Sequence, residues 1–374
     1  MLDPVIEFFK SVFHMIGSVI GKFILIMLSP FIFIRNLYRS SGWILKGLIA
    51  ILVLCILIPY SFFFWNSLWV RGYDLNYTAE LDLTDRKSTP GERVTIDGGS
   101  DTGKTCGPSA IIDVSRYLID FNVNQNSWMS GWLVYKLGLF GIPWDATPWM
   151  DNKATFQRGV HRGVTSAVIE MRETLGRIRG SSERDKDLND ALSNMQIDEF
   201  NWYFGLNPVG FKQTSWGSYR QAYKELGEYN TNLSRCEAFF DARADNLSNF
   251  LDRIAKDIGS TTAVIKDRAE QHNWGWFDTR ADNVFMEANG QLYAYLGLLR
   301  ATRQDFSEIV ERRNLDSLWD TMDAQLASAV QLSPLVISNG DEDGFIMPTH
   351  LTTMGFYILR VRTNLTEMRD VLKN

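Results

Sequence analysis

Histidine and cysteine are scarce in this sequence, and their scarcity limits the chemistry that it can support. Only four His and three Cys occur among 374 residues, and no two His lie at the spacing of metal ligands. Zinc sites are commonly built from these residue types, so a His-rich zinc site is not expected. Three Cys are also too few for a disulfide scaffold.

A surplus of positive charge is missing as well. The net charge is -6 at pH 7, and the basic residues form no stripe. Nucleic-acid binding depends on Lys and Arg side chains that neutralise phosphates, so nucleic acid is not an expected partner. The length suits one large domain or two modest ones with an ample core.

Recognisable catalytic motifs are also lacking. No G-x-S-x-G elbow occurs, and His161, His272 and His350 lie in different sequence surroundings. We therefore expect no enzyme, no catalytic residue and no cofactor. Carboxylates are plentiful, however, so action on peptidoglycan by paired acids stays open as an alternative.

One long uncharged segment is present. Residues 47–65 read GLIAILVLCILIPYSFFFW. At about 1.5 Å of rise per residue, such a run nearly spans a hydrocarbon core of about 30 Å. We predict a transmembrane helix over residues 43–69, with Tyr60, Trp65 and Trp69 as an aromatic belt at its distal end.

The charges on either side of this segment differ in sign. The basic residues that precede it are Lys10, Lys22, Arg35, Arg39 and Lys46, whereas Arg71 and then Asp74, Glu80, Asp82 and Asp85 follow it. By the positive-inside rule, the N-terminal side is cytoplasmic. The rest of the chain is then outside the cytoplasm, which is the periplasm of a Gram-negative cell.

The first 42 residues predict a further membrane helix. Polar residues recur every three or four positions at Glu7, Lys10, His14, Ser18 and Lys22. This stripe favours an amphipathic helix that lies in the interface or is partly re-entrant. A second span over residues 13–34 is the alternative, although it would place Lys22 inside the bilayer. Gly17 and Gly21 form a G-x-x-x-G element, a candidate face for self-association.

The outer part of the chain predicts an all-α fold. Residues 70–107 are polar and indicate a linker or a small β-like element. From residue 108 to residue 374 the periodicity is helical, as in a helical bundle. The expected helices cover residues 109–121, 155–179, 192–204, 219–240, 243–270, 281–311, 314–331 and 349–372.

A phosphate-loop pattern interrupts the polar segment. Residues 98–105 read GGSDTGKT, in which Gly98, Gly103, Lys104 and Thr105 fit G-x-x-x-x-G-K-[ST]. Such a loop needs a helix that begins at its Gly-Lys-Thr, but Gly107 and Pro108 follow, and Pro108 is the expected helix start. No alternating strands and helices follow either. A nucleotide-binding enzyme is therefore an alternative and not the main hypothesis.

An eight-residue pattern occurs twice. Residues 240–247 read FDARADNL and residues 277–284 read FDTRADNV, each at the start of an expected helix. Asp241 and Asp278 are expected N-caps, and Arg243 and Arg280 are expected to pair with Asp of the opposite copy. The alternative is a divalent-cation site formed by Asp241, Asp245, Asp278 and Asp282.

Two cysteines lie outside the membrane segment. Cys106 and Cys236 can either pair in an oxidising periplasm or remain separate thiols.

Several stretches resemble a known family. These are ARADNLSNFLDRI (242–254), ADNVFMEANGQLYAYLGLLRATRQDF (281–306), SPLVISNG (333–340) and THLTTMGFYILRVRTNLTEMRDVL (349–372). They are similar to an uncharacterised proteobacterial inner-membrane family, domain of unknown function 2333, over roughly residues 45–374. The resemblance implies a single-spanning protein with a helical periplasmic domain, and it supplies no ligand or catalytic residue. The first 40 residues and the GGSDTGKT loop depart from the family pattern.

Together these features predict an inner-membrane-anchored periplasmic helical protein. We expect a structural, scaffold or accessory subunit of an envelope or membrane-protein complex. Its expected partners are the lipid bilayer, other membrane or envelope proteins, and a second copy of the chain through the N-terminal helix. The alternatives are a nucleotide-binding enzyme that uses residues 98–105 and a peptidoglycan- or cation-binding periplasmic domain.

Overall fold

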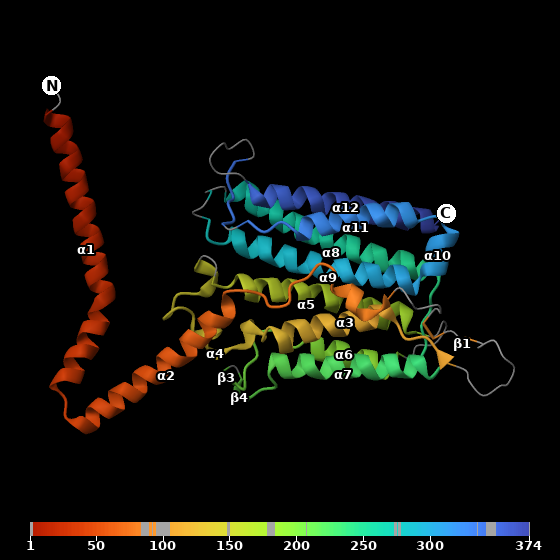
Figure 1. Ribbon diagram of the computed structural model, residues 1–374, viewed down its shortest axis with the longest axis horizontal. Coiled ribbons are helices and arrows are strands. Elements are labelled where there is room, and N and C mark those ends of the chain that lie inside the picture. The colour runs from red at the N-terminus through yellow and green to blue at the C-terminus, as the bar shows by residue number, and fades with distance from the viewer. Residues whose placement is uncertain are drawn as a thin grey trace. The chain divides into compact units, whose positions relative to one another are not determined.

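The computed structural model describes most of the chain (Figure 1). The described residues are 3–83, 90–91, 93–94, 105–147, 150–177, 184–206, 208–272, 275, 278–334, 336–341 and 349–373. The chain divides into two compact units, Met1–Phe63 and Phe64–Asn374, which are described separately.

The first unit consists of α1 (Asp3–Ser40) and most of α2 (Trp43–Ser67). Among the described residues, α2 is the helix long and apolar enough to cross a membrane, with a mean hydropathy of 2.6 over its most apolar window. The transmembrane helix expected over residues 43–69 therefore ends two residues earlier, at Ser67. The helix expected in the first 42 residues is present as α1.

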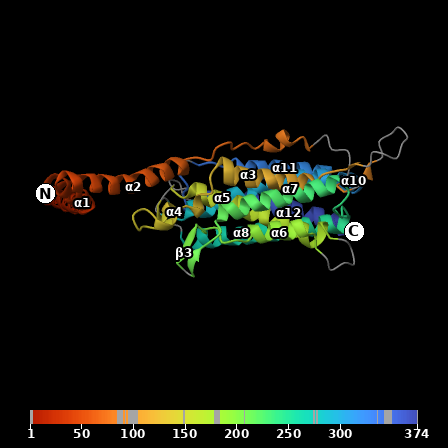
Figure 2. The ribbon, with the colours of Figure 1, turned by 90° about the horizontal axis from the view of Figure 1, so that it is seen from below.

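The second unit is a bundle of long helices that lie side by side (Figures 1 and 2). The helices are α3 (Ala110–Asp120), α5 (Asn152–Glu170), α6 (Lys186–Met195), α7 (Ser215–Ser234), α8 (Ala244–Gln271), α9 (Ala281–Asp305), α11 (Asp316–Val330) and α12 (His350–Lys373), with short α4 (Leu133–Leu137) and α10 (Ser307–Arg312). The all-α prediction is confirmed. Amphipathic periodicity explains this agreement, since each long helix buries one apolar face in a shared core.

Helix α9 is the central element of this bundle. Every residue from Ala288 to Leu299 is buried, and α9 packs against α3, α5, α8, α11 and α12. A helix that is enclosed on all sides reads as apolar around its whole circumference, and small residues allow its neighbours to approach. Tyr77, from the 3₁₀ helix Tyr77–Leu81, donates a hydrogen bond of 3.1 Å to the Tyr293 carbonyl of α9.

Three glycines make the contact between α5 and α9 unusually close. A Cβ atom on Gly159 would lie 2.0 Å from the carbonyl oxygen of Glu287, and a Cβ on Gly290 would lie 2.1 Å from that of Phe156. Gly163, one turn after Gly159, faces Ala294. The two backbones therefore touch directly, which is the packing that G-x-x-x-G spacing allows.

The start of α3 is fixed by side chains from two other helices. Its N-cap is Ser109, whose hydroxyl donates to Asp305 of α9 at 2.6 Å, while the same carboxylate accepts from the Ala110 amide at 2.8 Å. Asn230 of α7 accepts from the Ser109 amide at 2.7 Å. The helix thus begins at Ala110 and not at Pro108, because the capping partners converge on Ser109.

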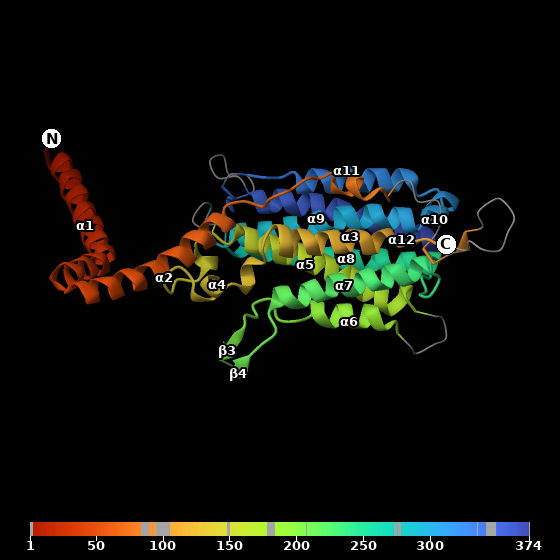
Figure 3. The ribbon, with the colours of Figure 1, turned by 60° about the horizontal axis from the view of Figure 1, so that its bottom comes forward.

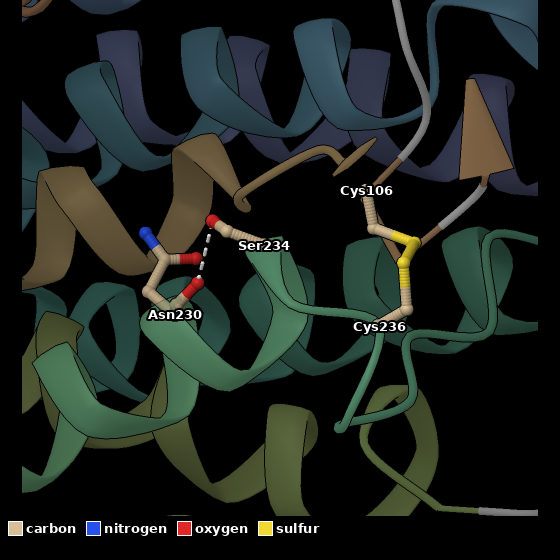
Figure 4. The surroundings of a disulfide bond; sticks show 4 residues. All are labelled: Cys106, Asn230, Ser234 and Cys236. Carbon is tan, nitrogen blue, oxygen red and sulfur yellow. Dashed lines mark hydrogen bonds between the residues drawn. A yellow bond between two sulfur atoms is a disulfide. The ribbon is translucent and has the colours of Figure 1, made fainter. Parts of the chain in front are cut away.

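A disulfide joins the segment before α3 to the segment after α7. Cys106 and Cys236 are bonded, with their Cα atoms 5.4 Å apart and a sequence separation of 130 residues. Figure 4 shows this bond beside the last turn of α7, where the Ser234 hydroxyl donates to the Asn230 carbonyl. Of the two states left open by the sequence, the structure has the paired one.

Strands are few among the described residues. Strand β1 (Arg93–Val94) pairs antiparallel with β2 (Thr105–Cys106), within residues 70–107, for which the sequence predicts a linker or a small β-like element. Strand β3 (Phe204–Leu206) forms a hairpin with β4 (Val209–Phe211). The helix expected over residues 192–204 is wrong: α6 begins earlier, at Lys186, and ends at Met195.

The position of α6 follows from its cap. The carboxylate of Asp185 accepts hydrogen bonds from the backbone amides of Asp187 and Leu188, which starts the helix there. After Met195, the carboxylate of Asp198 accepts from the Phe200 amide and forms a turn. The chain then continues into β3 and not into another helical turn.

Candidate functional site at one end of the bundle

The phosphate-loop pattern does not have the geometry of a phosphate site where it can be followed. Gly98, Gly103 and Lys104 lie outside the described residues. Thr105 is in β2, opposite Val94, and the next helix begins only at Ala110. A phosphate loop needs a helix that starts at its Gly-Lys-Thr, and this requirement is not met at Thr105.

The four aspartates of the repeated pattern do not converge. Asp241 and Asp245 lie at the start of α8, whereas Asp278 and Asp282 lie beyond its end, at the start of α9. A helix of 28 residues is roughly 40 Å long. The four carboxylates therefore do not form one cation site, and no group of three or more His, Cys, Asp or Glu suited to a metal occurs among the described residues.

The arginines of the repeat pair differently from the expectation. Arg243 binds Asp241 and Asp245 of its own copy, and Arg280 lies 3.3 Å from Asp145. They also occupy the N-cap positions of α8 and α9, without a side-chain cap. The expected pairing across the copies is wrong because α8 separates them.

Asp278 has a structural role. Its carboxylate accepts from the Arg268 Nε at 2.9 Å and from the Asn339 amide at 2.9 Å. Burial alone would raise the pKa of Asp278, but these hydrogen bonds hold it below its usual value. Asn339 also donates to the His272 carbonyl, so this cluster ties the end of α8 to the start of α9.

The glycine pair of the N-terminal helix remains available for contact. Gly17 and Gly21 both lie in α1, and a Cβ atom at either position would meet no other atom within 4 Å. Self-association through this face stays a prediction.

Exposed apolar side chains gather at one end of the bundle, and we call them the apolar rim. The most exposed are Phe211 at 92%, Val209 at 73% and Phe140 at 67%. They lie on two segments, around α4 and on the β3–β4 hairpin. The full set is Leu133, Leu137, Phe140, Ile142, Tyr203, Phe204, Val209 and Phe211. Figures 1, 2 and 3 place α4 and the hairpin at the end opposite α10 and the C-terminus.

Ring contacts connect the rim to the last turn of α2. The Phe64 ring lies 5.7 Å from that of Trp144, whose indole donates to the Val134 carbonyl of α4. Tyr135 stacks on Phe200 at 6.1 Å, and this residue precedes the hairpin. Within the second unit, the rim therefore lies near Phe64 and the other residues of the last turn of α2.

One rim residue has a strained backbone. Phe140 has a φ of 52°, between Gly138 at 66° and Gly141 at 94°. Positive φ is unfavourable for a bulky residue and persists only where its surroundings impose it. Here the turn is closed by a hydrogen bond of 2.7 Å from the Leu139 amide to the Ile142 carbonyl, and the Phe140 side chain is left exposed.

A cavity of about 520 Å³ lies at the same end of the bundle. Its described lining residues are Ser67, Leu68, Trp69, Val70, Tyr73, Leu75, Asn152, Lys153, Phe156, Phe285, Met286, Asn289, Val330, Gln331, Leu332, Ser333 and Pro334. Most are apolar, and none is acidic. Ligand sites are typically of this size and composition, with a few polar groups among apolar walls.

Lys153 is the charged group in the wall of this cavity. It is only 2% exposed, and no carboxylate among the described residues pairs with it. Burial, and next the positive charge of Arg71, lower the pKa of Lys153 from 10.5 to about 8. A buried ammonium without a counterion is unfavourable, so a bound anion would stabilise it.

Asp151, two residues earlier, is a buried carboxylate. It is fully buried, and neither carboxylate oxygen has a hydrogen-bond partner among the described residues. Burial, and next the negative charge of Asp282, raise the pKa of Asp151 to about 7. The start of α5 therefore holds two buried ionisable groups whose charged forms are destabilised.

The family model described as "Uncharacterized protein conserved in bacteria (DUF2333)" matches residues 141–275 and 261–374. The matches cover more than half of the chain. This chain belongs to the DUF2333 family. No curated protein and no solved structure matches it.

The family match contains most of the candidate site. In this DUF2333 member, Asp151, Lys153 and the β3–β4 hairpin fall inside the matched residues, whereas residues 45–140, which the resemblance was expected to include, lie outside them. Sequence reasoning missed Lys153, the rim and the hairpin. An available signal was NPVG at residues 207–210, a turn sequence flanked by Phe204 and Phe211.

Proposed function

We propose that this DUF2333 protein is a membrane-anchored scaffold or accessory subunit of the bacterial envelope. Its helical domain lies in the periplasm against the outer leaflet of the inner membrane, and it acts by binding and not by catalysis. The single observation that carries this proposal is the apolar rim at the end of the bundle where α2 arrives.

The rim favours contact with lipid because of its composition and its place in the chain. The last turn of α2 belongs to the same unit as the rim, so an α2 that spans the membrane would hold that end of the unit near the bilayer. Contiguous exposed apolar side chains mark interaction surfaces, and aromatic rings suit the membrane interface. Trp65 and Trp69, 55% and 46% exposed, add aromatic rings beside the end of the span.

The disulfide supports the proposed compartment. Disulfides form and persist in the periplasm, whereas the cytosol keeps thiols reduced. The bond between Cys106 and Cys236 joins the segment before α3 to the segment after α7. Both segments belong to the helical domain, so the whole domain would have to be in a compartment where disulfides persist.

Contact between the rim and the bilayer is tested on the full chain in liposomes. The free Cys55 is first replaced by Ser, and a fluorophore is attached at Phe211→Cys. Lipids spin-labelled near the head group should quench this fluorophore strongly. The matched control is Val371→Cys, an exposed apolar position in the last turn of α12, where we expect little quenching.

Equal quenching at the two positions would contradict a lipid-facing rim. The accessory role is tested by native mass spectrometry of complexes released from cell membranes. We expect the chain in a complex of fixed composition with another membrane protein. Recovery of isolated chains alone would contradict the scaffold role.

A further inference from the structure

The wall of the cavity beside Lys153 includes the end of α2 and the residues that follow it. Ser67 is the last residue of α2, and Ser67, Leu68 and Trp69 are all part of its wall. Leu68 and Trp69 are also largely exposed. With α2 in the bilayer, as in the proposed function, a lipid of the adjacent leaflet has a short path into this cavity.

The polar part of the cavity is positive. Lys153 projects from the first turn of α5, and Asp151, the N-cap residue, makes no side-chain hydrogen bond to the free amides of that turn. A helix N-terminus without such a cap favours a negative group. Arg71 adds a second positive charge, close enough to lower the pKa of Lys153.

The rest of the wall is suited to a hydrocarbon chain. Phe156 from α5 and Phe285 and Met286 from α9 line the cavity together with Leu332. No acidic residue among the described lining residues opposes an anion. The cavity thus combines one cationic end with an apolar interior, which is the complement of an anionic amphiphile.

We propose that this cavity binds one molecule of an anionic membrane phospholipid. The phosphate contacts the Lys153 ammonium and the first turn of α5, and an acyl chain packs against Phe156, Phe285 and Met286. Binding at Lys153 requires α2 to reach the bilayer, as in the proposed function, but it requires neither the scaffold role nor lipid contact by the rim.

The test uses the full chain in a mild non-ionic detergent, so its result is independent of compartment and protein partners. Dioleoyl phosphatidylglycerol, dioleoyl phosphatidylcholine and oleic acid are each added, and bound lipid is measured by native mass spectrometry. We expect one tightly held phosphatidylglycerol per chain. The Lys153→Met variant should bind it at least about tenfold more weakly, because a charge-assisted contact is lost.

Three variants make the result specific. Lys153→Arg keeps the charge and should retain binding. Lys256→Met removes an exposed lysine of α8 that pairs with Asp252, and should leave binding unchanged. Met286→Trp fills the apolar part while keeping Lys153, and should also weaken binding at least about tenfold, so the proposal does not depend on the folding of one variant.

Two outcomes would overturn the proposal. Phosphatidylcholine that binds as tightly as phosphatidylglycerol, with no effect of Lys153→Met, would show that the cavity does not select an anion. Oleic acid that binds more tightly than phosphatidylglycerol, and depends on Lys153, would assign the cavity to a free fatty acid and not to a membrane phospholipid.

Discussion

Two ionisable residues at the start of α5, an acid and a base, are buried without pairing with each other. Asp151 and Lys153 do not pair, and in each case burial, and next a charge of the same sign, disfavours the ionised form: Asp282 for Asp151 and Arg71 for Lys153. Such sites are unfavourable in the absence of a ligand and often mark function. Lys153 faces a cavity, whereas Asp151 faces the start of α9, so their consequences differ.

Asp151 makes the stability of the domain depend on pH. Its carboxyl ionises near pH 3.8 when unfolded and near pH 7 when folded. Between these values the unfolded chain binds fewer protons, so the free energy of unfolding falls as the pH rises from about 4 to about 7. Because one pKa unit equals about 1.4 kcal/mol and the pKa is raised by about 3 units, the Asp151→Asn variant should be more stable than the wild type at pH 8, on the order of 4 kcal/mol.

Denaturant unfolding of the full chain in detergent, followed by tryptophan fluorescence, measures this difference. At pH 4 the two proteins should be nearly equal in stability. The control is Asp320→Asn, which removes an exposed carboxylate of α11 and should change stability by less than about 1 kcal/mol. If the difference in the free energy of unfolding between Asp151→Asn and the wild type were the same at pH 8 as at pH 4, the pKa of Asp151 would not be raised in the folded protein.

At the scale of elements, the contact between α5 and α9 leaves no room for a Cβ atom at Gly159. A Cβ atom on Gly159 would overlap the Glu287 carbonyl at 2.0 Å, and this backbone atom cannot rotate away. Gly159→Ala should therefore force the two helices apart and lower the free energy of unfolding by about 1–3 kcal/mol or more. Thermal or denaturant unfolding of the full chain measures the loss.

Gly355→Ala is the matched control for this substitution. Gly355 is buried in α12, but its Cβ would meet only the Ile265 methyl group, at 3.5 Å. Alanine is the better helix former by about 0.5–1 kcal/mol, so this variant should be slightly more stable. Equal effects at the two glycines would mean that the α5–α9 contact is not as close as described.

The elements also show what the sequence can predict. Long amphipathic helices such as α8 and α12 were located to within about a residue, because periodicity reports the buried face directly. Within the described α-helices the G-x-x-x-G spacing occurs twice, at Gly17 and Gly21 of α1 and at Gly159 and Gly163 of α5. The first pair predicts a face for self-association, whereas the partner of the second pair is a distant helix of the same chain. Spacing alone does not identify the partner.

The candidate site was less predictable than the helices. Lys153 lies in an ordinary helical pattern, and only the fold brings Phe285 and Trp69 beside it. The alternative of a four-aspartate cation site could have been set aside from the sequence alone. Two copies at the starts of consecutive helices lie at opposite ends of the first helix, as Asp241 and Asp278 do, and this follows from chain connectivity.

At the scale of the whole molecule, the proposal depends on which side of the membrane the bundle occupies. Basic residues precede α2 and acidic residues follow it, which favours a cytoplasmic N-terminal side. The disulfide, and the proposed contact of the rim with lipid, are compatible with a bundle outside the cytoplasm. The charge asymmetry, the disulfide and the proposed lipid contact all indicate the same topology, which one set of fusions tests.

Alkaline phosphatase fused after Asn374 should be active, since it folds only where its disulfides form. The same enzyme fused after Ser41, between α1 and α2, should be inactive, while a fluorescent protein at Ser41 should be bright. A fluorescent protein before Met1 should also be bright if α1 lies in the interface, and dark if residues 13–34 cross the membrane. An active phosphatase at Ser41 with an inactive one at Asn374 would place the bundle in the cytoplasm, where the Cys106–Cys236 bond would not be expected to persist.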